Sequence, residues 1–186
     1  MANIVAIMGS PRRGGNSESL LWAFLSGRKE EDRLEVFIPA EMDIGFCRGC
    51  RFCEQMGYCA VHDDMERVLP ALLEADKVVV SAPVFFYGFP AHLKALIDRT
   101  QPLWVRRYLL KETMKLKDGF LLSVGATKGE KLFDGLVLTA RYFFDAFGCA
   151  YRGGLFFRGF DARGSIERCA QCLVDVEHSG KSFLQS

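Results

Sequence analysis

Four cysteines lie close together in the segment CRGCRFCEQMGYC, with the spacing C-x2-C-x2-C-x5-C. The first two intervals match those of a tight loop that binds three corners of a [4Fe–4S] cubane. Structural zinc sites usually place two cysteine pairs far apart in sequence, although an all-cysteine loop of this length can also bind zinc. A motif that retains its thiols but holds no metal is a third possibility. The candidate metal ligands are Cys47, Cys50, Cys53 and Cys59.

A second group of residues, GSPRRGGNSES, has the composition of a phosphate-binding loop. It follows an apolar run and precedes an amphipathic one, so it is expected between a strand and the amino terminus of a helix, where free N–H groups attract anions. The loop is neither a Walker loop nor a dinucleotide fingerprint, because Gly15, Asn16 and Pro11 occupy the diagnostic positions. The alternative is an exposed turn with a serine cap. The candidate phosphate ligands are Ser10, Arg12, Asn16, Ser17 and Ser19.

Two further loops offer groups for a planar ligand. SAPVFFYGFP ends a buried run in Pro83 and continues with Val84, Phe85, Phe86, Tyr87 and Gly88. Aromatic side chains beyond the end of a strand can flank a ring, although one of the two phenylalanines is expected in the core. SVGATKG offers backbone amides and a hydroxyl from Gly125, Ala126 and Thr127.

The hydrophobic pattern predicts the scaffold that positions these loops. Short apolar runs alternate with amphipathic segments, which favours a doubly wound α/β fold with five parallel strands and helices on both faces. Ligands of such sheets bind beyond the carboxyl ends of the strands. The expected strands are 3–8, 34–39, 77–83, 119–126 and 150–157. The expected helices are 17–29, 64–75 (with a kink or restart at Pro70), 90–103, 131–147 and one near 166–177.

Length and composition narrow the class of protein. A chain of 186 residues with 49% hydrophobic and 25% charged residues is expected to form one domain, 1–186, with a cysteine-rich insertion at 46–60. A net charge of +1 gives no reason to expect nucleic acid or an anionic membrane as a partner. The first residues, apolar before they are basic, do not resemble a secretory signal. A cytoplasmic location is therefore expected, where thiols stay reduced. Cys149 and the pair Cys169 and Cys172 are interpreted as buried thiols.

The motifs resemble those of a known family. GSPRRGGNSESL and SAPVFFYGFPAHLKALIDR resemble the NAD(P)H-dependent FMN reductases of flavodoxin-like fold, and CRGCRFCEQMGYCAVHDDM is similar to the cluster motif of iron–sulfur flavoproteins. Bacterial ferredoxin motifs continue with proline after the fourth cysteine, whereas Ala60 follows here. The resemblance covers roughly residues 3 to 130. It implies FMN with its phosphate on residues 10–19, Glu18 included, and its ring beside residues 83–88.

The resemblance implies an FMN-dependent oxidoreductase that transfers electrons between a reduced donor, such as NAD(P)H or a ferredoxin-like protein, FMN and a [4Fe–4S] cluster. Catalysis would belong to the cofactor, and no catalytic side chain is assigned. The acceptor is a small molecule or an electron carrier that the sequence does not identify. The alternatives are a flavodoxin-like electron carrier and a zinc-stapled binding protein. A homodimer or homotetramer is expected, because the cysteine loop carries apolar side chains at Phe46, Phe52, Met56 and Tyr58.

Overall fold

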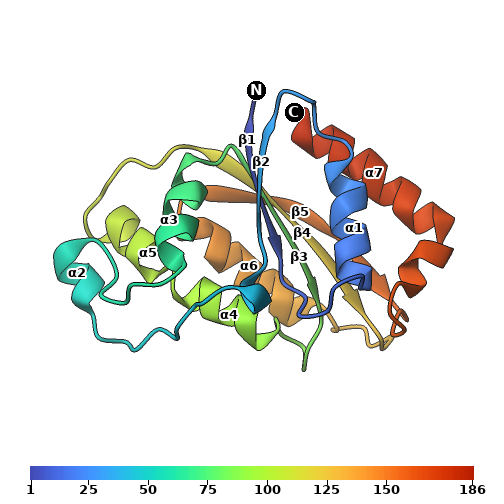
Figure 1. Cartoon of the computed structure of the whole chain (residues 1–186), viewed down its shortest axis with the longest axis horizontal. Coiled ribbons are helices and arrows are strands. Elements are labelled where there is room, and N and C mark those ends of the chain that lie inside the picture. Colours follow the sequence, from blue (N-terminus) through green and yellow to red (C-terminus); the bar gives the residue numbers. More distant parts are fainter.

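The computed structural model describes residues 1–186 and contains one five-stranded parallel sheet. The strand order is β2-β1-β3-β4-β5, so the chain reverses its direction of winding after β2 (Figure 1). This is the flavodoxin-like order, and the sequence-based prediction of the fold class is confirmed. The strands are β1 (Asn3–Met8), β2 (Arg33–Phe37), β3 (Lys77–Pro83), β4 (Lys117–Gly125) and β5 (Cys149–Arg158).

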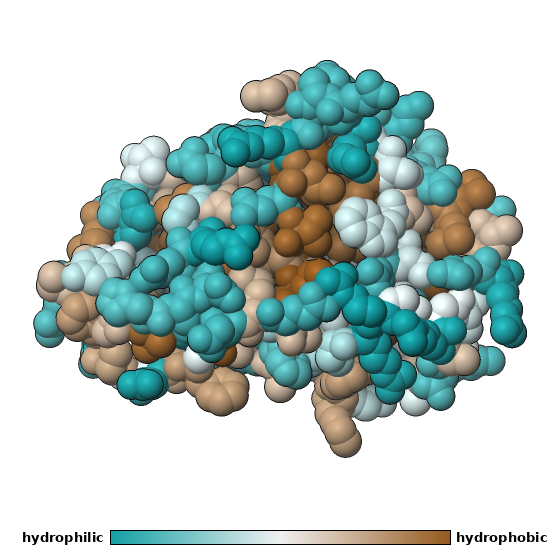
Figure 2. Space-filling view, in the orientation of Figure 1, coloured by the Kyte–Doolittle hydropathy of each residue, from teal (hydrophilic) through white to brown (hydrophobic).

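Helices cover both faces of the sheet (Figure 1). Alternate strand residues face opposite sides, so Ile4 and Ala6 pack in one core cluster while Val5 and Ile7 pack in the other. The helices α1 (Asn16–Leu25) and α7 (Ala170–Leu184) cover the first face, and α3 (Met65–Glu74), α4 (Ala91–Asp98) and α6 (Asp134–Asp145) cover the second. In Figure 2 apolar side chains gather beside edge strand β2, between α3 and α1.

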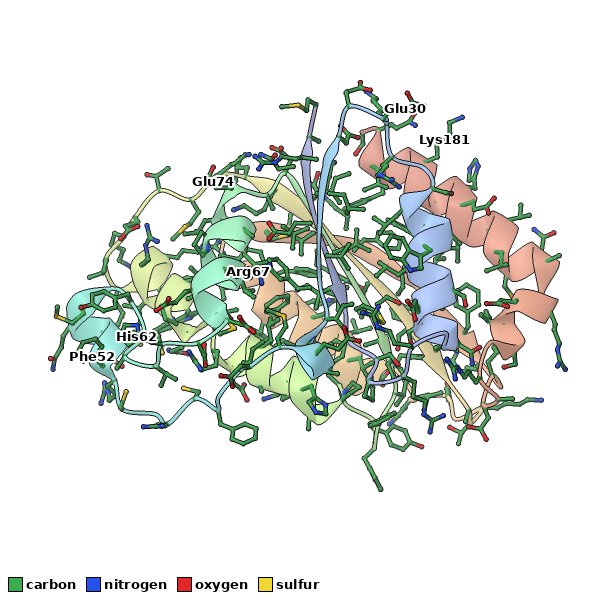
Figure 3. The ribbon with its side chains drawn as sticks, in the orientation of Figure 1. Glu30, Phe52, His62, Arg67, Glu74 and Lys181 are labelled. Atoms are coloured by element: carbon green, nitrogen blue, oxygen red, sulfur yellow. A yellow bond between two sulfur atoms is a disulfide. The ribbon has the colours of Figure 1, made fainter.

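Shorter elements complete the chain. They are α2 (Phe52–Met56) within the cysteine segment, α5 (Gln101–Tyr108), and two 3-10 turns, η1 (Pro39–Glu41) and η2 (Ser165–Arg168). In Figure 3 Phe52 and His62 lie at the end of the molecule that carries α2, whereas Lys181 lies on α7 across the sheet. No helix has the length and apolar character needed to cross a bilayer.

The element boundaries differ from the sequence-based prediction most clearly in the helices. The helix expected over 90–103 is two helices, α4 and α5, and Pro102 lies in the first turn of the second, where its missing N–H leaves no helical hydrogen bond unmade. Of the two effects expected at Pro70, a restart does not occur, because α3 continues through this residue. The last helix continues to Leu184, where Phe183 and Leu184 bury their side chains in the core.

The α1–α7 contact depends on glycine. A Cβ atom placed on Gly180 would lie 2.1 Å from the carbonyl oxygen of Phe24, and one on Gly27 would lie 2.4 Å from the backbone nitrogen of Lys181. Both neighbours are backbone atoms, which cannot move aside as a side chain can. The two helices therefore cross at a distance that only glycine permits.

The cysteines outside the motif are of two kinds. Cys149 is buried as expected, and this burial raises the pKa of its thiol to about 12. The interpretation of Cys169 and Cys172 as buried thiols is wrong: they form a disulfide, and both are only half-buried. The disulfide closes the first turn of α7, and Cys172 packs partly against the core.

Candidate functional site

A cavity of about 110 Å³ opens at the carboxyl ends of β1, β3 and β4, where the three loops meet. Ten of its lining residues come from those loops, as the order of the strands predicts. The cavity also borders the segment that follows β5, at Phe160, Asp161 and Arg163. The residues from the three loops are Ser10, Arg12, Gly15, Asn16, Ser17, Pro83, Val84, Phe85, Gly125 and Ala126.

The first loop presents donors to this cavity. Helix α1 begins at Asn16, and the backbone N–H groups of Asn16 and Ser17 have no partner, whereas those of Glu18 and Ser19 donate to the carbonyl of Gly15. The Ser10 hydroxyl accepts a hydrogen bond from the backbone N–H of Arg12 (3.1 Å), which folds the loop tightly. The Arg12 side chain is exposed and forms no ion pair. Arg13, by contrast, pairs with Glu41 and Glu18. Of the two arginines in this loop, Arg12 is therefore the one whose guanidinium is free at the cavity.

Glu18 and Ser19 lie away from the cavity. Glu18 accepts a hydrogen bond from the backbone N–H of Gly14 (2.5 Å), and the Ser19 hydroxyl donates to Glu167 (2.8 Å). Both side chains hold the loop and the start of α1 in place. The structure thus brings four of the six candidate phosphate ligands to the cavity and places these two behind it.

Sequence reasoning did not assign the segment after β5. The Asn16 side chain joins it to the first loop, since its Nδ2 donates to Ala162 O (3.1 Å) and its Oδ1 accepts from the backbone N–H of Ile166 (3.0 Å). Arg163 reaches the carbonyl of Gly14 (3.4 Å) and adds a second positive charge at the rim. The rule that ligands bind beyond the carboxyl ends of parallel strands, applied to the fifth strand as well, would have included Arg163.

The aromatic loop forms a tight hairpin. Phe85 and Gly88 exchange both backbone hydrogen bonds (3.0 and 2.9 Å). Between them Phe86 and Tyr87 have φ of 47° and 59°, a turn that L-residues rarely adopt. Pro83, Val84 and Phe85 line the cavity, and the side chains of Phe86 and Tyr87 project into solvent. Neither phenylalanine is in the core, so the expectation that one would be buried is wrong.

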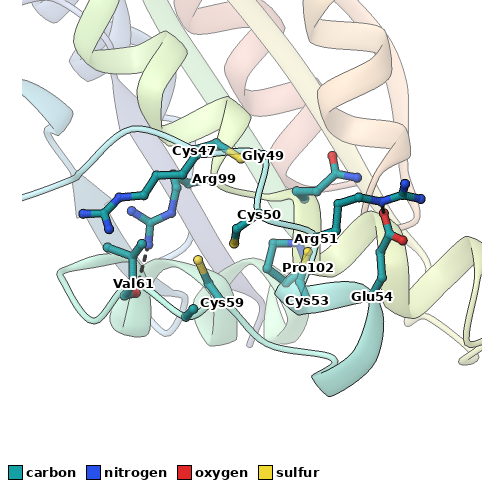
Figure 4. A pocket seen from close by; sticks show the side chains of 13 residues that line it. Cys47, Gly49, Cys50, Arg51, Cys53, Glu54, Cys59, Val61, Arg99 and Pro102 are labelled. Atoms are coloured by element: carbon teal, nitrogen blue, oxygen red, sulfur yellow. Dashed lines mark hydrogen bonds and ion pairs between the residues drawn. The ribbon is translucent and has the colours of Figure 1, made fainter.

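A second cavity, of about 210 Å³, lies in the cysteine segment. All four motif cysteines line it, and in Figure 4 the side chains of Cys50, Cys53 and Cys59 point into a common space with Cys47 and Arg99 at its edge. Burial raises the pKa of Cys53, and the charges of Cys59, Cys47 and Cys50 raise it further. Positive φ at Gly49 and Arg51 turns the chain around the cavity.

The donor set consists of four thiols that line one cavity. Thiolate sulfur is the ligand of all-cysteine sites for both zinc and [4Fe–4S] clusters. The side chains are not gathered tightly around one point, since no three histidine, cysteine, aspartate or glutamate side chains lie close enough to hold one metal ion.

A buried ion pair between Arg99 and Asp63 holds the cysteine segment in place. Arg99, immediately after α4, donates to both oxygens of Asp63 (2.6 and 3.0 Å) and to the carbonyls of Gly45 and Val61 (2.9 and 3.1 Å). Gly45 precedes the first cysteine and Val61 follows the last, so one guanidinium ties the two ends of the segment together. Burial favours the neutral form of Asp63, but hydrogen bonds from Arg99 and the backbone outweigh it and lower the pKa of Asp63.

The two cavities lie at opposite ends of α4. The aromatic hairpin precedes this helix and Arg99 follows it. Helix α4 has eight residues, and a rise of about 1.5 Å per residue places its two ends roughly 12 Å apart along the helix axis. The cysteine segment exposes the side chains of Phe46, Met56 and Tyr58. The Phe52 ring packs edge-on against the Tyr58 ring, with 5.5 Å between the ring centroids.

Comparisons with known proteins show what the chain is similar to. The model of the NADPH-dependent FMN reductase family matches residues 2–149. Over 127 residues the chain is 37% identical to an iron-sulfur flavoprotein of Methanosarcina thermophila, a match that covers 67% of this chain and 64% of the relative. Over 126 residues it is 35% identical to an iron-sulfur flavoprotein of Methanocaldococcus jannaschii, which covers 67% of this chain and 63% of the relative. The chain spans less than two thirds of the length of these two relatives.

A solved structure shares the fold over nearly the whole chain. The NAD(P)H:quinone oxidoreductase from Methanothermobacter marburgensis superposes with a TM-score of 0.72 at 18% sequence identity, covering 96% of this chain and 94% of that one. At this identity the likeness establishes the flavodoxin-like fold alone.

Proposed function

Because the chain belongs to the NADPH-dependent FMN reductase family, we propose that it is an FMN-dependent oxidoreductase in which the cysteine motif holds a [4Fe–4S] cluster and NAD(P)H is the electron donor. The observation that carries this proposal is the cavity at the carboxyl edge of the sheet, where an anion-binding loop meets an aromatic one. The names of the NAD(P)H-dependent structural relative and of the iron–sulfur relatives support the donor and the cluster.

The residues of the first cavity divide into two groups. Ser10, Arg12, Ser17 and the first N–H groups of α1 would bind the FMN phosphate, and Asn16 would fix the loop against the segment after β5. Residues 83–88 and 125–127 would border the flavin ring. Bound FMN can exchange either one or two electrons, which lets it join a hydride donor to a one-electron partner. The protein's part is to bind and orient the ring.

The residues of the second cavity would hold the cluster through thiolate ligands from Cys47, Cys50, Cys53 and Cys59. A cluster supplies single-electron transfer. Cysteine binds iron as the thiolate, so uptake of the cluster would release the protons of the four thiols.

The remaining assignments follow from the same proposal. The chain would act as one domain in the cytoplasm, as a homodimer or homotetramer, with a small molecule or an electron-carrier protein as acceptor. An even assembly would cover the exposed Phe46, Met56 and Tyr58 and bring the cysteine segment of one subunit towards the flavin of another.

A pair of cysteine variants tests the cluster. In Cys50→Ser we expect iron and its broad visible absorption to be lost while FMN stays bound, since other loops build the flavin cavity. The matched control is Cys149→Ser, because that thiol is buried outside both cavities and should leave iron and FMN unchanged. Equal iron contents in the two variants would contradict the ligand assignment.

Steady-state kinetics test the enzymatic part of the proposal. We expect the FMN-loaded protein to oxidise NADH or NADPH with a quinone or free flavin as acceptor. A protein that binds FMN but shows no turnover with either nucleotide would be an electron carrier instead.

A further inference from the structure

We infer that Arg99 stabilises the reduced form of the cluster in the cysteine cavity and thereby sets its reduction potential. The inference rests on the proposed cluster and concerns a residue outside the four-cysteine motif. Arg99 lies 40 positions after Cys59 in the sequence, yet it lines the same cavity.

The hydrogen bonds of Arg99 leave one donor free. A guanidinium has five N–H groups. Four of them are used, two on Asp63 and one each on the carbonyls of Gly45 and Val61. The fifth, on Nε, is buried and has no partner, although the side chain is only 1% exposed. A buried donor without an acceptor is costly, so its presence indicates a group that would accept from it.

The place of Arg99 identifies that group. Arg99 lines the cavity together with all four motif cysteines, and Figure 4 shows it beside Cys47, Cys50 and Cys59, with its contact to Val61 dashed. Asp63, its carboxylate partner, does not line the cavity. The ion pair is therefore oriented with its positive end towards the thiols. A cluster sulfide or a ligating cysteine sulfur is the acceptor that this position offers.

The effect on potential follows from charge. A cluster held by four thiolates is an anion, and reduction adds one further negative charge. A nearby positive charge and an N–H donor to sulfur both favour the reduced form, and hence a higher potential. Arg51 also lines the cavity, but it is largely exposed and paired with Glu54, so solvent screens its charge. The buried Arg99 is screened far less.

Two charge-removing variants separate this role from a purely structural one. Arg99→Gln removes the positive charge and the Nε–H group, so the cluster should become harder to reduce. Asp63→Asn removes the compensating negative charge and leaves the guanidinium, so the cluster should become easier to reduce. The measurement is an anaerobic redox titration of each reconstituted protein, followed by electron paramagnetic resonance, with iron and FMN contents determined in parallel.

We expect the two variants to shift the reduction potential of the cluster in opposite directions from wild type. Each shift should change the ratio of reduced to oxidised cluster at a fixed potential at least tenfold, which corresponds to about 59 mV for a one-electron couple. Unchanged potentials, or displacements of the same sign, would overturn the inference, because loosening of the segment alone has no reason to act with opposite signs.

The same measurements distinguish a failure of this inference from a failure of the proposed cluster. Wild-type protein that takes up no iron would refute the cluster itself. If only Arg99→Gln fails to retain iron, the reduction potential of Asp63→Asn decides. A potential in Asp63→Asn at or below that of wild type would refute the role of Arg99. Loss of iron from both variants, with FMN retained, would show that Arg99 and Asp63 only hold the cysteine segment in place. That result would also refute the inference.

Discussion

Replacement of Arg12 by alanine tests the phosphate end of the flavin cavity. Arg12 lines this cavity, is exposed and forms no ion pair, so its guanidinium is available for a dianionic phosphate. A hydrogen bond to a charged group contributes about 1.5–3 kcal/mol. We therefore expect Arg12→Ala to weaken FMN binding roughly 10- to 150-fold. Because the neighbouring Ser10–Arg12 contact uses backbone atoms of Arg12, the loop itself should keep its shape.

The assay is titration of apoprotein with FMN, followed by quenching of flavin fluorescence. Arg13→Ala is the matched control, because Arg13 is committed to Glu41 and Glu18 and does not line the cavity. Riboflavin, which lacks the phosphate, should bind wild type and Arg12→Ala with similar affinity. Unchanged FMN affinity in Arg12→Ala, or an equal loss in Arg13→Ala, would refute the assignment of the phosphate to this loop.

Three further predictions concern stability and assembly. Gly180→Ala should lower the free energy of unfolding by about 1–3 kcal/mol in urea denaturation, since the added Cβ meets the Phe24 carbonyl; an unchanged value would show that α1 and α7 can separate without cost. The Asp63 carboxyl has a lowered pKa in the folded protein, so its stabilising contribution is complete above its unfolded pKa of about 3.9 and is lost as pH falls through the folded value. Urea midpoints should therefore drop below about pH 4, and less steeply in Asp63→Asn; parallel profiles would exclude this role. Light scattering of the flavin-loaded protein at micromolar concentration should give a dimeric or tetrameric mass, and a monomeric mass would contradict the proposed assembly.

The sequence predicted the sheet well because strand signals were local. Runs such as Asn3–Met8 and Lys77–Pro83 are rich in apolar and β-branched residues, as is typical of doubly buried parallel strands, and their predicted bounds match the structure. The break between α4 and α5 was also local, at Pro102, but the apolar periodicity on both sides concealed it. The extent of α7 depended instead on tertiary packing of Phe183 and Leu184 under α1.

The cavities were only partly predictable. The motif residues could be recognised from their type and spacing. Arg163 and Arg99, by contrast, reach the two cavities through tertiary contacts that the spacing does not encode. Arg99 in particular looks like the ordinary basic end of a helix. Its buried partners, Asp63, Gly45 and Val61, lie 36, 54 and 38 residues earlier in the chain. Long-range pairing of this kind becomes visible only when the sheet has brought the segments together.

Cofactor analysis of protein produced with ample iron and purified under nitrogen tests the flavin site and the cluster site together. A visible spectrum, together with iron, zinc, sulfide and FMN determinations, reports on both cavities. We expect one FMN and about four irons with matching sulfide per chain, as a [4Fe–4S] cluster requires. Protein that binds no FMN, or that carries zinc in place of iron and sulfide, would contradict the proposed function.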